Sequence, residues 1–259
     1  MIIVKSPREI ALMKEAGKLV AKVFETVEPF IKPGISTYEI NEIAEKVIYD
    51  AGGSCPCKGY YDYPAGTCVS VNDTLIHGIP SKKIILKEGD IVSLDVVANL
   101  HGYCADATRT FGVGILKESV KELLEATKEA FYKGINEAKP HHRVGDISAA
   151  IQQYIESKGY NVARDFTGHG IGKGMHEDPI VPNYGVPGTG PLLQIGMALA
   201  IEPMVLEGKK ETRVLGDGWT VKSKDGKLTC HYENTIVITE EGCEIITLTE
   251  GEKVINVKN

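Results

Sequence analysis

Residues 91–111 read IVSLDVVANLHGYCADATRTF. Two segments of this stretch alternate as strands do, and Asn99–Gly102 between them has the composition of a turn, so we predict a β-hairpin. If Asn99 pairs with Gly102, the register places Asp95 directly opposite Asp106, with Cβ atoms roughly 4.5–5.5 Å apart. Two carboxylates at that range repel each other unless a cation or a proton lies between them.

The residues around Asp95 on its strand are apolar, which indicates a buried strand. An exposed hairpin whose acids face water is the ordinary alternative. However, a second acid, Glu202, follows the apolar run Met197–Ile201 in the same way. Two such interruptions favour buried acids with a shared function.

The order helix–helix–strands occurs twice in the chain. Hydrophobic spacing and capping residues predict four helices: Ser6–Ile31, Ser36–Ala51, Glu118–Ala138 and Val144–Gly159. A shift of 107 residues places Asp95 on Glu202, and a shift of 127 residues places Asp106 on Glu233. Two unrelated halves are the alternative. The coincidence of the acids favours a mixed α+β fold in which two pseudo-twofold halves, about 1–115 and 116–259, form one catalytic domain.

The composition is that of a globular chain, with 259 residues, 42 % hydrophobic and 25 % charged, and a formal net charge of −6. The apolar start Met1–Val4 meets Lys5 at once, so we expect neither a signal peptide nor a membrane span. Six cysteines are too few for a disulfide-stapled fold, which predicts a reduced, cytoplasmic protein. The mild acidity without basic runs argues against nucleic-acid binding as the core function.

The segment Phe166–His176, FTGHGIGKGMH, has a glycine at every second position from 168 to 174. This spacing matches neither GxGxxG nor a P-loop, and His176-Glu177 does not open an HExxH motif. A flexible loop is the ordinary alternative. Because glycines on both sides of His169 allow close approach, we interpret His169 as a neutral nitrogen ligand of a metal held otherwise by oxygen.

Four carboxylates and one imidazole now form a candidate ligand set: Asp95, Asp106, His169, Glu202 and Glu233. Such a set suits two bridged divalent cations, which together activate water and polarise a carbonyl group. Oxygen-rich ligation without thiolate favours the harder ions Mn, Fe(II) and Co, with Zn as a further candidate.

These motifs resemble those of the type I methionine aminopeptidases, which are dimetal hydrolases of the pita-bread fold. The glycine-histidine segment, continued to Pro182-Asn-Tyr184, is similar to the family's signature, and Ile201-Glu-Pro-Met204 and Glu233-Asn-Thr235 are similar to its other ligand motifs. The resemblance covers nearly all of the chain. It implies the pita-bread fold and implies that the five candidate residues are the dimetal ligands.

The resemblance also implies roles for residues near the metals. His77 matches the family's histidine near the scissile bond, and His176 matches its second substrate-contacting histidine. Five further residues fall where the family lines its methionine pocket: Cys57, Tyr60, Tyr63, Cys68 and Trp219. Without the resemblance, these thiols and tyrosines read as ordinary buried or loop-packing residues. Tyr61 and Met175 depart from the side chains of other members, His and Phe among them.

The implied reaction is removal of the N-terminal methionine from nascent polypeptides when the second residue is small. A hydroxide bridging the metals would attack the scissile carbonyl, with Glu202 as ligand and proton shuttle and His77 and His176 stabilising charge or holding the substrate. The implied protein is a cytoplasmic monomer whose partners are nascent-chain N-termini, with ribosome association also expected from such substrates.

Two alternatives remain. One is a proline-directed relative such as prolidase or aminopeptidase P, which usually carries an extra N-terminal domain. The other is a pita-bread binding module that has lost catalysis, and the complete ligand set argues against it.

Overall fold

The structure is a computed structural model that describes residues 1–252. The helical elements within that range are α1 (Pro7–Val27), η1 (Glu28–Phe30), α2 (Thr37–Asp50), η2 (Tyr60–Asp62), α3 (Glu118–Ile135) and α4 (Val144–Ser157). The strands of the first half are β1 (Cys68–Val71), β2 (Thr74–Ile76), β3 (Ile91–Leu100) and β4 (Tyr103–Gly112). The strands of the second half are β5 (Asn161–Val162), β6 (Thr167–Gly170), β7 (Glu177–Pro182), β8 (Ala198–Ile201), β9 (Met204–Leu206), β10 (Thr212–Val214), β11 (Val221–Ser223), β12 (Thr229–His231), β13 (Glu233–Ile238) and β14 (Cys243–Ile245).

The first two helices begin where their capping residues predict. Ser6 caps α1 through a reciprocal capping box with Glu9, and Ser36 caps α2 in the same way. The predicted helix to Ile31 ends its α-helical part at Val27, because Pro29 lacks an N–H and the chain tightens into the 3₁₀ turn η1. The third and fourth helices end a few residues before their predicted ends.

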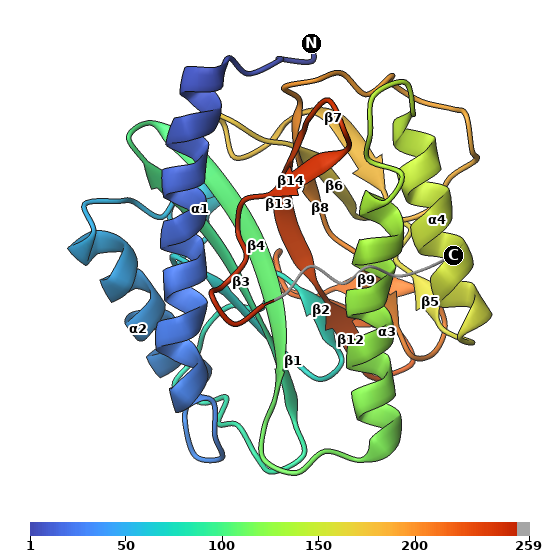
Figure 1. The fold of residues 1–259 in the computed structure, drawn as a ribbon. Coiled ribbons are helices and arrows are strands. Elements are labelled where there is room, and N and C mark those ends of the chain that lie inside the picture. The colour runs from blue at the N-terminus through green and yellow to red at the C-terminus, as the bar shows by residue number, and fades with distance from the viewer. Residues whose placement is uncertain (253–259) are drawn as a thin grey trace.

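An antiparallel sheet of eight strands forms the centre of the described chain, in the order β1-β3-β4-β13-β8-β6-β7, with β14 also pairing to β13. Helices α1 and α2 cover the part of the sheet built from the first half, and α3 and α4 cover the other part (Figure 1). Each helix pair closes its own hydrophobic cluster against the sheet. The pairing of β4 with β13 joins the two halves into one sheet.

The internal repeat is visible in the backbone. Helices α2 and α4 have the same length and lie 107 residues apart at both ends. Gly52 and Gly159, the equivalent residues after these helices, have φ of 77° and 83°, the left-handed conformation that glycine tolerates at a helix C-terminus. Phe24 and Phe131 are equivalent as well, and both are buried.

The register of the central hairpin differs from the predicted one. Leu100 pairs with Tyr103, so the turn consists of His101 and Gly102, whose φ values are 53° and 82°. Two successive positive φ angles make the tight turn that matches strand twist, and this turn moves the register by two residues. The prediction that Asp95 and Asp106 face each other directly is therefore wrong, since Asp95 pairs with Thr108 and Asp106 with Val97. Because the shift is even, both acids stay on the same face as diagonal neighbours.

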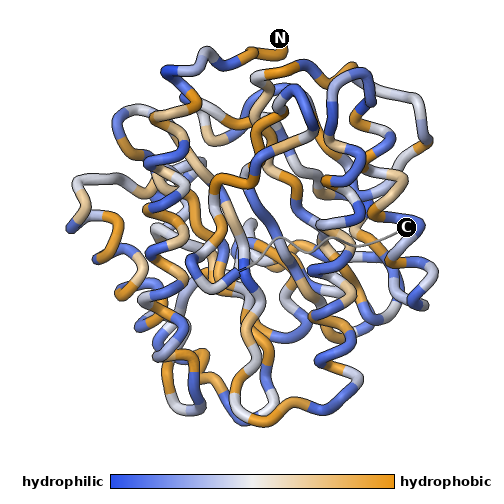
Figure 2. Tube along the Cα trace, in the orientation of Figure 1, coloured by the Kyte–Doolittle hydropathy of each residue, from blue (hydrophilic) through white to orange (hydrophobic). Residues whose placement is uncertain are grey.

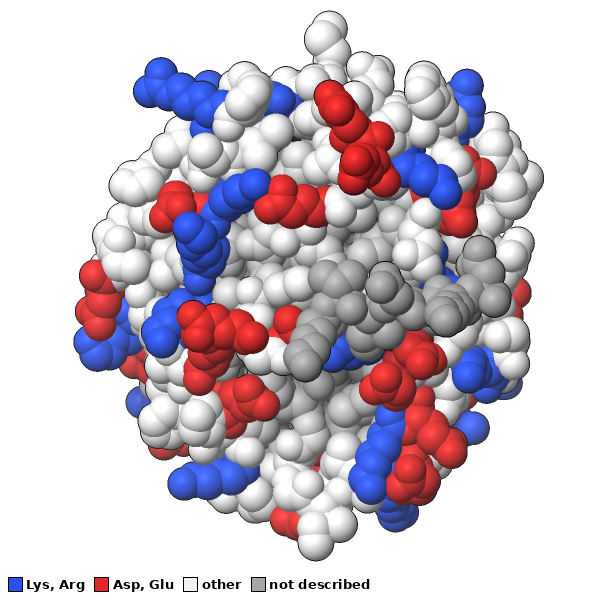
Figure 3. Space-filling model, viewed as in Figure 1, with Lys and Arg blue, Asp and Glu red and all other residues white. Residues whose placement is uncertain are grey.

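Hydrophobic residues recur between hydrophilic ones along the helices, as expected for helices with one face on a core (Figure 2). On the face shown in Figure 3, basic and acidic side chains are interspersed. Over residues 1–252, no helix has the length and apolar character needed to cross a membrane.

Candidate metal centre

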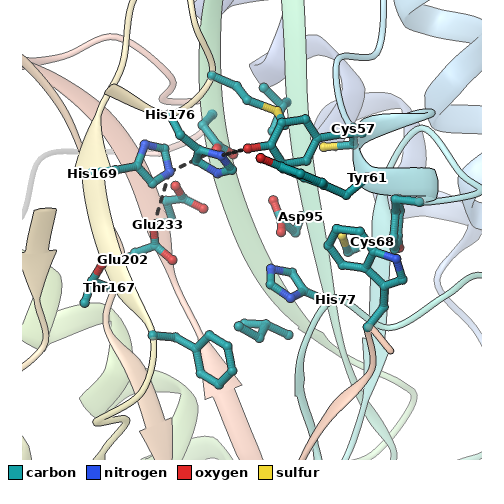
Figure 4. Close-up of a pocket in the computed structure, with 18 of the residues that line it drawn as sticks. Cys57, Tyr61, Cys68, His77, Asp95, Thr167, His169, His176, Glu202 and Glu233 are labelled. Carbon is teal, nitrogen blue, oxygen red and sulfur yellow. Dashed lines mark hydrogen bonds and ion pairs between the residues drawn. The ribbon is translucent and has the colours of Figure 1, made fainter. Parts of the chain in front are cut away.

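The five candidate ligands come from neighbouring strands of the central sheet. Their positions are Asp95 on β3, Asp106 on β4, His169 on β6, Glu202 directly after β8, and Glu233 at the start of β13. Because β3, β4, β13, β8 and β6 are successive in the sheet, side chains on one face converge although the residues span 138 positions of sequence. Figure 4 shows Asp95, His169, Glu202 and Glu233 directed toward a common space.

The imidazole of His169 is oriented toward two of the carboxylates. Its Nε2 lies 3.7 Å from Oδ2 of Asp106 and 3.6 Å from Oε1 of Glu202. On the other side of the ring, Nδ1 lies 2.9 Å from the carbonyl oxygen of Gly170, an acceptor that assigns the ring proton to Nδ1. Burial lowers the pKa of His169 to about 4, which makes the imidazole neutral near pH 7. A lone pair on Nε2 therefore faces the acids.

The environment of the four candidate carboxyl groups disfavours their charged forms. Burial raises the pKa of all four carboxyls: Asp95, Asp106, Glu202 and Glu233. The charge of neighbouring carboxylates raises the pKa of Asp106, Glu202 and Glu233 further. A cation placed between them would favour the ionised forms instead.

Unpartnered ligand atoms test whether this donor set fits a metal. Oδ1 of Asp106 and Oε1 of Glu233 are buried and have no hydrogen-bond partner among residues 1–252. Ligand atoms of Asp106, His169 and Glu233 all lie within 4.8 Å of one another. Carboxylate oxygens with one neutral imidazole nitrogen are donors for divalent cations, so the residues present fit such ions.

Neighbouring side chains hold these ligands in place from behind. The Thr108 hydroxyl donates to Oε2 of Glu233 over 2.8 Å. The Asp106 N–H donates to Oγ1 of Thr235 over 2.9 Å, and that hydroxyl donates back to the Asp106 carbonyl. Arg109 donates to the Glu233 carbonyl over 2.6 Å. Such outer-sphere contacts fix the orientation of metal ligands.

A cavity of about 790 Å³ opens above the five candidate ligands. All seven residues predicted to contact substrate line it: Cys57, Tyr60, Tyr63, Cys68, His77, His176 and Trp219. The rings of Tyr63 and Trp219 meet edge to face at 5.1 Å between centroids, and His77 meets Trp219 at 5.8 Å and Phe166 at 6.0 Å. Aromatic rings and acidic side chains therefore line the same cavity.

The two histidines predicted to contact substrate differ in their surroundings. His77 has φ of 56°, a left-handed conformation that is uncommon outside glycine and that points to a functional constraint. Burial lowers its pKa to about 4. His176 packs its ring edge to face on His169, with 4.4 Å between centroids, and its Nδ1 lies 3.4 Å from the Tyr60 hydroxyl. Burial lowers the pKa of His176 as well.

Tyr61 and Met175 also line this cavity. Tyr61 is 78 % exposed and has φ of 45°, whereas Met175 is buried. Tyr61 stacks edge to face on Tyr60 at 4.6 Å between centroids.

One residue at the centre is absent from the sequence-based set. The Nε2 of His231 lies 3.6 Å from Oε2 of Glu202 and 3.8 Å from Oε2 of Glu233. The signal that could have found it is its position two residues before Glu233, because residues two apart on an extended chain share a face.

Comparisons with known proteins show which family the chain belongs to. The family model described as metallopeptidase family M24 matches residues 11–240. Methionine aminopeptidase 1 of Bacillus subtilis is 49 % identical over 247 residues, which cover 95 % of this chain and 99 % of that protein.

Solved structures show how far the fold is shared. The crystal structure of methionine aminopeptidase from Thermotoga maritima superposes with a TM-score of 0.94 at 47 % identity, covering 96 % of this chain and all of that one. Prolidase from Pyrococcus furiosus superposes with a TM-score of 0.78 at 25 % identity, and the match covers 96 % of this chain but only 66 % of the prolidase. The predicted pita-bread fold, mixed α+β with a curled antiparallel sheet, is confirmed. The chain thus belongs to the type I methionine aminopeptidases of metallopeptidase family M24.

Proposed function

We propose that this chain removes the N-terminal methionine of polypeptides by using two divalent ions held by Asp95, Asp106, His169, Glu202 and Glu233. One observation carries the proposal. Donor atoms of Asp106, His169 and Glu233 lie within 4.8 Å of one another in a cavity that Asp95, Glu202 and several aromatic rings also line, which supports the proposal. An exopeptidase for methionine needs both features next to each other.

Divalent ions in such a site lower the pKa of a water molecule and polarise the scissile carbonyl group. The side chains supply the rest of the chemistry. Glu202 lines the cavity, and we assign its carboxylate to carry a proton to the leaving amine. Neutral His77 and His176 line the same cavity and are assigned to hold the substrate backbone and stabilise developing charge.

The aromatic lining of the cavity accounts for methionine. A methionine side chain is long, unbranched and apolar, and its sulfur makes favourable contacts with ring edges. Tyr63 and Trp219 contribute aromatic rings to the cavity lining, and Cys57 and Cys68 contribute small thiols. We assign the preference for a small second residue to crowding by His77, which lies with Phe166 on the wall beside the acids.

Several further assignments belong to this proposal. All six cysteines are free thiols, which suits a reducing cytoplasm. Strands from both halves share the central sheet, which supports one catalytic domain across residues 1–252; the last residues of the proposed domain, 253–259, lie outside the described residues. The oxygen-rich ligands favour Mn, Fe(II) or Co over Zn. We further propose that the chain acts as a monomer on nascent chains, at or near the ribosome.

The experiment compares Asp106→Asn with a matched control, Asp165→Asn. Both acids line the cavity, but Asp165 accepts its hydrogen bond from Thr212 and lies outside the proposed ligand set. Metal content by elemental analysis and cleavage of Met-Ala-Ser are measured for each variant. We expect two ions per wild-type chain, loss of metal and activity in Asp106→Asn, and near-wild-type behaviour in Asp165→Asn. Full metal content and activity in Asp106→Asn would contradict the ligand assignment.

A further inference from the structure

His231 is a buried imidazole that the reaction outlined above does not use. It is 2 % exposed, and within the described part of the chain its Nε2 has no hydrogen-bond partner. Two carboxylate oxygens lie within 4 Å of that nitrogen: Oε2 of Glu202 at 3.6 Å and Oε2 of Glu233 at 3.8 Å. A buried polar nitrogen without a partner is costly, so its retention calls for a physical reason.

The backbone fixes where this ring can point. His231 is the last residue of β12 and pairs with Met204 of β9. Thr110 of β4 holds it on both sides, because its hydroxyl accepts from the His231 N–H over 3.2 Å and donates to the His231 carbonyl over 2.7 Å. The backbone of His231 is therefore held by the sheet, and its ring lies beside Glu202.

The position of the ring argues against contact with substrate. His231 is not among the residues that line the 790 Å³ cavity; it lines a second cavity of about 260 Å³ together with Arg109 and Tyr232. The Glu233 oxygen that it faces is already bound by the Thr108 hydroxyl. The imidazole thus approaches Glu202 and Glu233 from outside the substrate cavity, as outer-sphere partners do, and its ligand atom lies within 4.8 Å of ligand atoms of both acids.

Glu202 lies between two imidazoles with different tasks. Its Oε1 faces Nε2 of His169, and its Oε2 faces Nε2 of His231. Carboxylate oxygens only accept hydrogen bonds, so the ring proton of His231 belongs on Nε2. A closure of about half an ångström brings the 3.6 Å separation to the upper end of the ordinary N–H···O range.

We propose that His231 is a positioning residue that donates its Nε2–H to Oε2 of Glu202 and so presents Oε1 of Glu202 beside His169 to the metal. The inference rests on the proposed assignment of Glu202 as ligand and proton carrier. It extends that assignment, because the residue that holds Oε2 also limits how readily the Glu202 carboxylate turns.

The test uses two substitutions of similar length, His231→Gln and His231→Met. Glutamine keeps an N–H donor at the end of an unbranched chain, whereas methionine keeps the bulk without the donor. Tyr232→Phe is the matched control. It removes a hydroxyl group from the same second cavity, but that hydroxyl donates to Glu252 and not to Glu202. Mn²⁺ affinity of the metal-free proteins is measured by calorimetry, kcat and KM are measured on Met-Ala-Ser, and melting temperatures show which variants fold.

We expect His231→Met to lower Mn²⁺ affinity and kcat by about 10–100-fold with little change in KM, a magnitude typical of losing an outer-sphere partner. His231→Gln should recover most of the loss, and Tyr232→Phe should resemble the wild type. A folded His231→Met with wild-type affinity and kcat overturns the proposal. So does a folded His231→Gln that is no better than His231→Met.

A measurement on the wild type alone gives an independent check. In the Co²⁺-loaded protein, a metal-bound imidazole has a strongly shifted N–H proton signal in the NMR spectrum. We expect one such exchangeable signal, from Nδ1–H of His169. Two signals would make His231 a ligand and overturn the positioning role.

Glu202→Gln separates this inference from the function on which it rests. If Glu202→Gln keeps its metal and its activity, the ligand assignment itself fails. If Glu202→Gln loses them while His231→Met does not, only the role of His231 fails.

Discussion

The ammonium group of Lys5 lies 2.6 Å from Oε2 of Glu177, although 172 positions separate the two residues in sequence. Both side chains are largely buried, at 3 % and 12 % exposure. Glu177 follows His176 directly and also accepts from the Gly174 N–H. The ion pair therefore ties the N-terminal segment to the loop that carries a proposed substrate-contacting histidine.

Replacing Lys5 by Met should destabilise the fold and lower kcat/KM. It leaves the Glu177 carboxylate buried without its partner, which costs about 3–5 kcal/mol, and loosens the His176 loop. The double variant Lys5→Met/Glu177→Gln should recover part of the stability, measured by urea unfolding. Lys18→Met is the control, because Lys18 pairs with Glu15 on the exposed surface of α1. Equal effects of Lys5→Met and Lys18→Met would contradict this role.

Removing the metal should abolish activity and lower the melting temperature. The reason is that ions which bind the folded state preferentially stabilise it, and the buried carboxylates of Asp106 and Glu233 repel each other without them. Adding Mn, Co or Fe(II) after chelation should restore both the activity and the melting temperature. Calorimetry measures the melting temperature, and peptide cleavage measures the activity. Full activity in protein shown by elemental analysis to be metal-free would refute the dimetal proposal.

Substituting Ala for His77 or His176 should lower kcat/KM by about 100-fold or more, as expected when one positioned donor is lost. Metal content should stay at the wild-type level, because neither residue belongs to the proposed ligand set. Both quantities are measured on the same preparations. Loss of metal in His77→Ala would place His77 among the ligands instead.

The buried state of His77 should make stability depend on pH. Its pKa falls to about 4 in the fold against 6.5 ordinarily, so between these values the unfolded chain binds a proton that the folded chain does not. Proton uptake by His77 in the unfolded chain therefore destabilises the fold progressively as pH falls from about 6.5 toward 4. Relative to His77→Asn, the wild type should lose up to about 2 kcal/mol more in free energy of unfolding between pH 7 and pH 5. Parallel pH profiles of the two proteins would rule this out.

Substrate preference should follow the shape of the cavity. Met-Ala and Met-Gly peptides should be cleaved much faster than Met-Leu or Met-Lys peptides, and N-acetylation should nearly abolish cleavage because it removes the free amine. Norleucine should replace methionine with modest loss, since an apolar pocket discriminates by only about 1–3 kcal/mol per methylene, whereas branched leucine should fare much worse. A tripeptide panel measures this. If Xaa-Pro peptides with other first residues were the best substrates, the proline-directed alternative would replace the proposal.

Local signals in the sequence determined the helices and the chemistry of the site. Ser6 and Ser36 satisfy the first backbone N–H groups of their own helices, so they mark helix starts without reference to distant residues. Acids that interrupt apolar strands stand out for an equally local reason, because burying a carboxylate among apolar residues needs compensation. That reasoning singled out Asp95 and Glu202, and the fold brings their side chains to one face of the sheet.

Contacts between distant segments were decided only by the tertiary structure. The register that makes Asp95 and Asp106 diagonal neighbours depends on positive φ angles at His101 and Gly102, which composition alone does not specify. The backbone of His231 is bound by Thr110, a residue 121 positions earlier in the chain.

The physical reason is the range of the interactions. Caps and hydrophobic periodicity act over a few residues and leave a signature in the neighbouring sequence. The ion pair of Lys5 with Glu177 and the approach of His231 to Glu202 form only after the sheet has assembled. A lysine or a histidine in the sequence therefore shows which charges and hydrogen-bond donors are available. The packing of distant segments decides which acid each of them contacts.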